Sequence, residues 1–212
     1  PWFDGTNDYN DIYSTSFNSA FNWNAGTIMI WFKISNAGIW TNGLGAYPIL
    51  FKSSATADYI TISKQSENNK VGFALNFGGV WKGVTPTLGP SINWFHGVLT
   101  WDTVANQLKG YVNGTQVGST QTGLGVPSGG ALAVCCTNIG SWWHTGLVWN
   151  GWLAHGAVWD TPLSSTQIAD LAVVEKFQSS GTTTSSIFDT EQGSNWGTLT
   201  YNATTPTNTS VS

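Results

Sequence analysis

The chain has 212 residues, of which only 8% are charged, and its formal net charge is -4 at pH 7. All seven basic residues are lysines that stand singly, and the composition excludes a nucleic-acid-binding surface because arginine is absent. No run approaches the roughly 18 to 20 apolar residues of a membrane span. A polar surface of Asn, Thr, Ser, Gln and Gly with thirteen tryptophans is typical of a secreted, cell-surface or virion protein.

The N-terminus, PWFDGTNDYN, lacks the basic and apolar regions of a secretion signal, so we expect a chain that is mature, trimmed or never carried one. The first strong β-like run is TIMIWFKI (27–34). It is apolar on both faces, which predicts a central strand of a two-layer sheet. DYITISK (58–64) and KVGFALNF (70–77) flank the polar turn QSENN and are predicted to form a hairpin.

Two further strands are predicted in WFHGVLTWD (94–102) and QLKGYVNG (107–114). The pair Asn113-Gly114 indicates another hairpin, because both central residues of such a turn need a positive φ. ALAVCCTNIG (131–140) and WNGWLAHGAVWD (149–160) are the last strong strands of this part. Turn signals separate about a dozen strands without helix alternation, so the pattern predicts an all-β sandwich or jelly roll.

One substantial helix is predicted near residues 164–175, in TPLSSTQIADLAVVEKF. Pro162 precedes it, and Ser164 with Gln167 has the spacing of a capping box. The helix carries a short apolar stripe formed by Ile168, Leu171 and Ala172. We expect two or three turns packed against a sheet edge.

The composition changes after Phe177, where QSSGTTTSS is typical of a linker. We therefore predict a domain over residues 1–177 and a linker with a β-rich tail over 178–212. Two strands are not stable alone in water. The tail is therefore expected to belong to a truncated module, to pair with a neighbouring copy, or to fold back on its own domain. The residues expected to carry such contacts are Trp196, Leu199, Tyr201 and Val211.

Five segments occur in the order seen in one known family: FDGTNDYNDI, TIMIWFKI, WFHGVLTWD, LKGYVNGTQVGS and NGWLAHGAVWDTPLSSTQIADL. Over residues 2 to 173 the chain resembles laminin-G-like domains, which are concanavalin A-like jelly rolls. The resemblance implies two curved antiparallel sheets with one short C-terminal helix. It also implies a structural role for His96 and core or near-core positions for four further residues, Trp94, Leu99, Trp101 and Tyr111.

The resemblance also implies a structural calcium ion, to which an Asp in the Gly-led final strand often contributes. Here Ala154 stands where that Asp is often found, which weakens the calcium hypothesis. Asp4 and Asp8 remain the possible oxygen ligands. We otherwise expect no metal and no cofactor.

The same fold hosts glucanases, whose catalytic carboxylates come from one strand as Glu-x-Asp-x-Glu, with two-residue spacing that puts them on one face. The three glutamates here fall in a turn, in the helix and in the tail: Glu67, Glu175 and Glu191. Three isolated aspartates are interpreted as strand-end and turn residues: Asp58, Asp102 and Asp160. We therefore expect no catalytic residues and no enzyme activity.

Cys135 and Cys136 are adjacent, so a disulfide between them could not close a long loop. We expect one or both to be small buried hydrophobic residues, with a vicinal disulfide as the alternative.

The segment SWWHTGLVWN (141–150) contains the aromatic and polar residues expected of a ligand site. Trp142 and Trp143 are adjacent, so in an extended segment they cannot both face the core. His144 lies beside them, and Trp40 is a second loop candidate. Such rings suit neutral glycans, although they also serve to close the ends of a sandwich or to pack against a neighbouring subunit.

Three functions follow from these features. The first is a structural or adhesive module of an extracellular or virion-surface assembly, whose partners are copies of itself or neighbouring surface proteins. The alternative is a carbohydrate-binding lectin module that takes neutral glycans. The third, a glycoside hydrolase, is disfavoured because paired carboxylates are missing.

Overall fold

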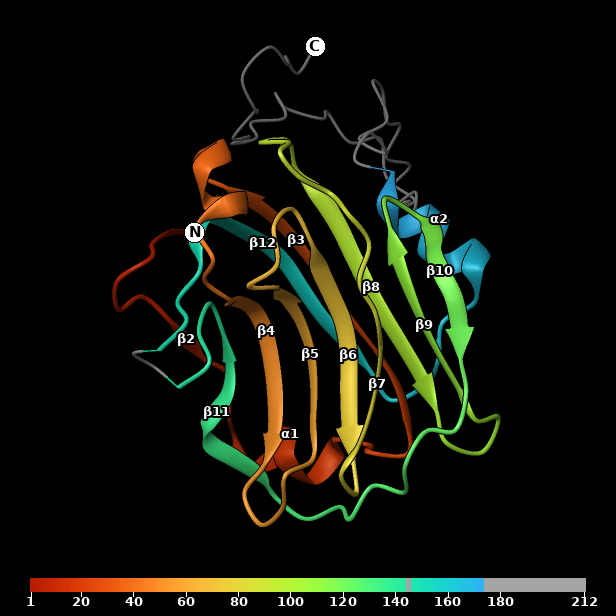
Figure 1. Cartoon of the computed structure of the whole chain (residues 1–212). Helices are drawn as coiled ribbons and strands as arrows, with labels where there is room; N and C mark the ends of the chain where they lie inside the picture. Colours follow the sequence, from red (N-terminus) through yellow and green to blue (C-terminus); the bar gives the residue numbers. More distant parts are fainter. Residues whose placement is uncertain (144–145, 174–212) are drawn as a thin grey trace, which may run out of the picture. The chain divides into compact units, whose positions relative to one another are not determined.

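The computed structural model describes residues 1–143 and 146–173, and these form two six-stranded antiparallel sheets (Figure 1). Sheet 1 has the order β1-β12-β3-β8-β9-β10 and sheet 2 the order β2-β11-β4-β5-β6-β7. The strands of sheet 1 are β1 (Trp2–Asp4), β12 (Asn150–Trp159), β3 (Ala25–Ile34), β8 (Phe95–Asp102), β9 (Gln107–Val112) and β10 (Thr115–Gln121). Those of sheet 2 are β2 (Asn10–Asp11), β11 (Leu132–Ile139), β4 (Ala46–Ser53), β5 (Tyr59–Lys64), β6 (Val71–Phe77) and β7 (Val80–Val84).

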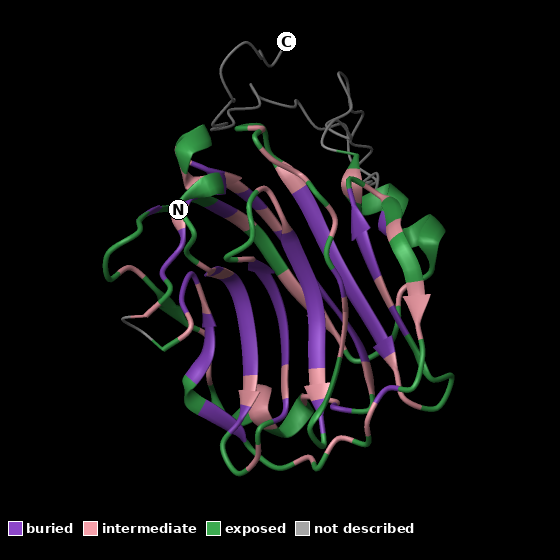
Figure 2. Ribbon diagram, in the orientation of Figure 1, coloured by how far each residue is buried: buried purple, intermediate pink, exposed green. Residues whose placement is uncertain are grey.

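The core lies between the two sheets, as expected for a sandwich. Along β3, alternate side chains of Ile28, Ile30 and Phe32 face inward. They belong to one cluster with Phe51 and Phe73 of sheet 2. Figure 2 shows buried residues along the central strands of both sheets. The predicted two-sheet sandwich is confirmed.

Two predicted local features are confirmed by the backbone. Asn113 and Gly114 have φ of 49° and 81° and join β9 to β10 in a hairpin. Helix α2 (Ser165–Ala172) has the full capping box between Ser164 and Gln167. Ile168 is its buried residue.

Two short helical segments were not predicted. Helix α1 (Thr15–Ala20) is capped by the Ser14 hydroxyl, and the 3₁₀ segment η1 (Ala37–Thr41) is capped by Asn36. Neither shows a capping-box pair or a long apolar stripe, so neither has a strong sequence signal.

Of the four expected core residues, Leu99, Trp101 and Tyr111 are buried, but Trp94 is 39% exposed. Trp94 is two residues before His96, just ahead of β8, and alternation places it on the outer side of sheet 1. His96 is fully buried, with its ring centroid 5.0 Å from that of Trp31.

Two of the isolated aspartates organise turns, as interpreted from the sequence. The Asp58 carboxylate is buried and accepts hydrogen bonds from the backbone N–H groups of Gly78 (2.8 Å) and Ser128 (2.6 Å). It thereby ties two loops to the start of β5. Asp102 caps the turn after β8 by accepting from the N–H groups of Val104 and Ala105.

The domain boundary predicted at residue 177 and the whole predicted tail lie outside the described residues. Glu175 and Glu191 also lie outside them. In the described ranges, no helix is long and apolar enough to cross a membrane.

Candidate binding site

A row of side chains crosses four strands on the outer face of sheet 2. Lys52 on β4 is opposite Tyr59 on β5, Tyr59 is opposite Asn76 on β6, and Asn76 is opposite Trp81 on β7. Directly opposed residues share a face of the sheet. This face is the outer one, because the neighbouring Ile60 points into the core. We call these four residues the outer row.

The outer row is long enough for more than one ring of a ligand. Four neighbouring strands span about 14 Å, since strands lie about 4.8 Å apart. Trp81 at one end of the row is 49% exposed. The next row on the same face holds Leu50, Thr61, Ala74 and Gly83. The first three are buried, and the Trp81 ring lies 2.9 Å from where a Cβ on Gly83 would be.

The segment after β11 brings two tryptophans to the same face. The Trp142 ring lies 4.6 Å from that of Tyr47 and 5.8 Å from that of Tyr59, measured between centroids. Trp143 is 6.4 Å from Trp142 and is 56% exposed. Lys52 of the outer row places its Nζ 5.8 Å from the Trp143 ring centre. The tryptophans thus extend the outer row with two more rings.

Backbone hydrogen bonds define the loop that carries these rings. The Trp142 N–H donates to the carbonyl of Gly146 over 2.9 Å, and the Trp149 N–H donates to the carbonyl of Gly140 over 2.7 Å. Trp149 itself is buried in the core. The loop is therefore closed at its base and anchored by a core side chain.

The tyrosines of the site stay neutral near physiological pH. Burial raises the pKa of Tyr59, and hydrogen bonding from Trp81 and Asn76 partly offsets this rise. Burial and the neighbouring Tyr59 raise the pKa of Tyr47. The Oδ1 atom of Asn76 is buried and has no hydrogen-bond partner among the described residues. The site therefore offers aromatic faces and hydroxyl groups, with Lys52 as its charged group.

Cys135 and Cys136 form a vicinal disulfide. Cys136 is buried, as expected of at least one of the pair, but the bonding state is the alternative that the sequence left open, a vicinal disulfide. The pairing of β11 with β4 is irregular between Leu132 and Thr137, and the disulfide lies inside that irregularity. Cys136 belongs to a cluster with Leu50 and Ala133, against which Tyr59 and Trp142 pack. The disulfide thus supports the rings of the site from below.

Trp40, expected as a second exposed loop aromatic, is instead fully buried. Segment η1 turns its ring inward, where Nε1 donates to the Ser91 carbonyl over 2.6 Å. A side chain on Gly89 would contact the Trp40 ring at 2.7 Å, so Gly89 permits this packing. The expectation of an exposed Trp40 is wrong, and His144 lies outside the described residues.

The possible calcium ligands Asp4 and Asp8 serve a turn. One Asp8 carboxylate oxygen accepts from the Asp4 N–H, and one Asp4 carboxylate oxygen accepts from the Thr6 N–H, each over 2.7 Å. In residues 1–143 and 146–173, no three His, Cys, Asp or Glu side chains gather as a metal site would require.

The sequence did not single out most of the site. Tyr47, Tyr59, Asn76 and Trp81 come from strands whose order in the sheet is needed to bring them together. The available signal was alternation, since Asn76 falls on the face opposite to Phe73 and Leu75 in β6.

Sheet 1 carries a different aromatic pair on its outer face. The rings of Trp2 and Trp152 lie 4.5 Å apart, and the Lys33 Nζ is 5.0 Å from the Trp152 ring centre. Trp2 is 48% exposed and Trp152 is 37% exposed. The pair closes the edge of the sheet where β1 meets β12.

A family model described as the concanavalin A-like lectin/glucanases superfamily matches residues 4–169. The chain belongs to this superfamily. The predicted laminin-G-like, concanavalin A-like domain is thereby confirmed. No curated protein matches the chain significantly.

Solved structures share the superfamily fold at low sequence identity. One is the CBM40 domain of a Ruminococcus gnavus sialidase, bound to α2,3-sialyllactose. It has 14% sequence identity and a TM-score of 0.60, and the match covers 80% of this chain and 95% of that one. Domain 4 of an extracellular arabinanase from Geobacillus stearothermophilus, in complex with arabinotriose, has 18% identity and a TM-score of 0.54, covering 70% and 66%. A heptameric pentraxin from Limulus polyphemus has 20% identity and a TM-score of 0.52, covering 70% of each chain. At these identities the likeness shows the fold alone.

Proposed function

We propose that this chain is a non-catalytic carbohydrate-binding module that acts outside the cell. One observation carries the proposal, namely the group of aromatic rings on the outer face of sheet 2. Trp81 and Trp143, each about half exposed, flank it, and Tyr59 lies in the outer row between Lys52 and Asn76.

The chemistry of a sugar fits such a surface. A pyranose ring has apolar C–H faces and a rim of hydroxyl groups, so it stacks on flat aromatic rings while its rim is hydrogen-bonded. The Tyr59 hydroxyl and the Lys52 ammonium, both on partly exposed side chains, can hydrogen-bond the rim of a sugar. A surface about 14 Å long suits an oligosaccharide better than a single sugar.

Two structural neighbours support the ligand class. The Ruminococcus gnavus domain is bound to sialyllactose, and the Geobacillus stearothermophilus domain is in complex with arabinotriose. The second domain belongs to an extracellular enzyme. These neighbours favour a carbohydrate ligand and an extracellular location for this chain, without indicating which glycan it takes.

The absence of catalysis is part of the proposal. A retaining glycosidase needs two carboxyl groups about 5 to 5.5 Å apart. The outer row contains no carboxylate, and Glu67 lies in the turn between β5 and β6, where it forms an ion pair with Lys70. We therefore expect binding without cleavage.

The structural or adhesive role in an assembly remains a prediction. The residues expected to join copies, Trp196, Leu199, Tyr201 and Val211, lie outside the described residues. The exposed rings of sheet 2 favour the carbohydrate-binding alternative over this first hypothesis.

The proposal is tested by comparing Trp143→Ala with Trp152→Ala. Wild-type protein is first applied to an array of neutral and acidic oligosaccharides, and the best ligand is then titrated by calorimetry. We expect Trp143→Ala to weaken binding at least tenfold, about 1.4 kcal/mol. Trp152→Ala removes an exposed tryptophan from the other sheet and is expected to leave affinity unchanged. Absence of any glycan binding by the wild type, or equal losses in both variants, would contradict the proposal.

A further inference from the structure

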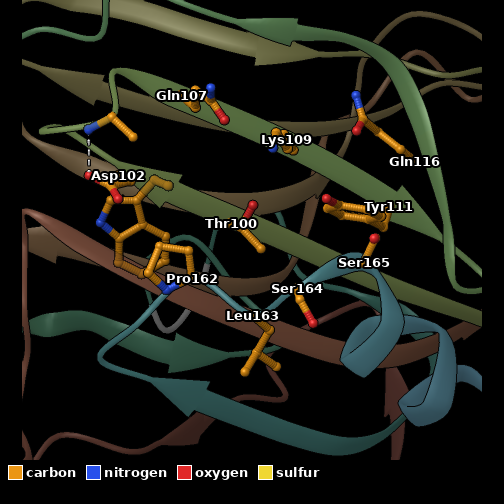
Figure 3. Close-up of a pocket in the computed structure, with 12 residues that line it drawn as sticks. Thr100, Asp102, Gln107, Lys109, Tyr111, Gln116, Pro162, Leu163, Ser164 and Ser165 are labelled. Carbon is orange, nitrogen blue, oxygen red and sulfur yellow. Dashed lines mark hydrogen bonds between the residues drawn. The ribbon is translucent and has the colours of Figure 1, made fainter.

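A small pocket lies on the outer face of sheet 1, between strands β8, β9 and β10 and the start of α2 (Figure 3). Its volume is about 210 Å³. This is below the range of roughly 300 to 1,000 Å³ typical of sites for drug-sized ligands. The pocket therefore suits one small chemical group or a single sugar residue.

Tyr111 contributes a buried polar group to this pocket. The residue is 3% exposed, and its ring packs with Met29, Val98 and Ile168. Its hydroxyl makes no hydrogen bond with any described residue, and its oxygen end points toward Thr100 in Figure 3. Burial raises the pKa of Tyr111, so the hydroxyl keeps its proton and can donate it to a ligand.

The N-terminus of α2 contributes backbone donors. The Ser164 hydroxyl accepts from the Gln167 N–H, which is the third of the helix. The N–H groups of the first two residues, Ser165 and Thr166, have no acceptor inside the helix and donate to no described side chain. Ser165 is the one of the two that lines the pocket. Together with the helix dipole, such groups favour an anion.

Lys109 adds a positive charge to the lining of the pocket. No described carboxylate forms an ion pair with it. Asp102 is the carboxylate that lines the same pocket, and one of its oxygens is occupied by the N–H groups of Val104 and Ala105. The hydrogen-bond donors of the pocket include Lys109, Tyr111 and the start of α2. No carboxylate lies among these donors in the lining of the pocket.

We propose that this pocket binds an acidic sugar residue through its carboxylate or sulfate group. The oxyanion accepts hydrogen bonds from the backbone N–H of Ser165 and from the Tyr111 hydroxyl, and Lys109 supplies the opposite charge. The Thr100 hydroxyl and the Gln107 amide line the rest of the pocket and suit the sugar hydroxyls. The pocket lies on sheet 1, so this site is separate from the aromatic site on sheet 2.

The test is an NMR titration of the ¹⁵N-labelled full chain with four probes: glucuronate, glucose 6-sulfate, glucose and inorganic sulfate. We expect both acidic sugars to shift the amide resonance of Ser165, and to bind more tightly than glucose or inorganic sulfate. Lys109→Gln is expected to weaken the acidic sugars at least fivefold. Tyr111→Phe, which keeps the ring, is expected to weaken them about threefold.

Lys70→Gln is the control, because it removes the same charge from the turn before β6, far from the pocket in the sequence and on the other sheet's side. It is expected to leave the titration unchanged. The proposal is overturned if neither acidic sugar shifts the Ser165 amide, or if Lys109→Gln and Lys70→Gln have equal effects. It is also overturned if glucose or inorganic sulfate binds as tightly as the acidic sugars, since the sugar and the charge must both contribute.

Discussion

The outer faces of the two sheets are built from the same alternation of side chains but are covered differently. On sheet 1, α2 packs over part of the face, where Ile168 meets Met29, Val98 and Tyr111. On sheet 2, the corresponding layer consists of rings from a loop, with Trp142 lying against Tyr47 and Tyr59. One face is therefore closed by a helix, and the other presents aromatic surface.

The difference follows from the residues at the outward positions. Large apolar side chains on sheet 1 need a cover, which an amphipathic helix supplies. The outward positions of sheet 2 next to the outer row, such as Leu50, are covered by aromatic rings without a helix. Stability is thus expected to depend on the part of sheet 1 beneath α2, and glycan stacking on the aromatic rings of the outer face of sheet 2, separate from the acidic-sugar pocket proposed on sheet 1.

The largest expected effect comes from removing the contact beneath the helix. Ile168 is fully buried, so Ile168→Ala is expected to lower the free energy of unfolding by about 3 kcal/mol through lost burial and a cavity. Urea denaturation measures this change. Leu171→Ala, at a position 37% exposed on the same helix, is the control and should cost less than about 1 kcal/mol. Equal costs at the two positions would mean that α2 is not a specific cover for sheet 1.

A pH effect is expected from His96 on the same sheet. Burial lowers the pKa of His96 to about 4, and neither ring nitrogen has a hydrogen-bond partner among the described residues. In the unfolded chain the pKa is about 6.5. The unfolded state therefore binds the proton first, and stability falls as pH drops from about 6.5 toward 4. The full loss below pH 4 is on the order of 3 kcal/mol.

The measurement compares wild type with His96→Leu by urea denaturation at several pH values. The difference between the two proteins isolates the contribution of the histidine. The variant is expected to lose less stability between pH 6.5 and 4. Parallel curves for the two proteins would mean that the buried ring does not carry this dependence.

The strands were predictable because burial between two sheets imposes a local pattern. TIMIWFKI forms the central strand β3. The hairpin at Asn113 was predictable because an Asn-Gly pair tolerates the positive φ angles that both residues adopt. The capping box at Ser164 is equally local. These features depend on a few neighbouring residues, which is why sequence alone sufficed.

The binding site was only partly predictable, because it depends on which strands become neighbours. Trp142 and Trp143 were identified by their adjacency, but Tyr59 and Trp81 join them only through the order of sheet 2. Trp40 was misjudged since its loop position gave no sign that η1 would turn the ring inward. The vicinal disulfide was left as the lesser alternative because adjacency in sequence does not show which bonding state the strand accommodates.

A smaller effect is expected when the support beneath the rings is removed. Replacing both Cys135 and Cys136 with serine breaks the disulfide under Tyr59 and Trp142 while nearly keeping side-chain size. We expect glycan affinity to fall about fivefold, close to 1 kcal/mol, because the rings lose a fixed contact. Calorimetry with the best glycan checks this, and wild type treated with a dithiol reductant should behave alike. Unchanged affinity in both preparations would show that the rings hold their positions without the disulfide.

The smallest expected effects come from the two lysines that lie over tryptophans, one on each sheet. Lys33 lies over Trp152 and Lys52 over Trp143, with Nζ-to-ring distances of 5.0 Å and 5.8 Å. Such contacts at exposed positions stabilise by about 0.5 to 1 kcal/mol.

Lys33→Gln should therefore lower the free energy of unfolding slightly and leave glycan affinity unchanged. Lys52→Gln should weaken glycan binding about twofold, because Trp143 loses one of the contacts that orient its ring. Thermal unfolding and calorimetry on both variants separate the two effects. If Lys33→Gln weakened glycan binding as much as Lys52→Gln, the proposed division between a stabilising Trp152 on sheet 1 and a glycan-stacking Trp143 on sheet 2 would be wrong.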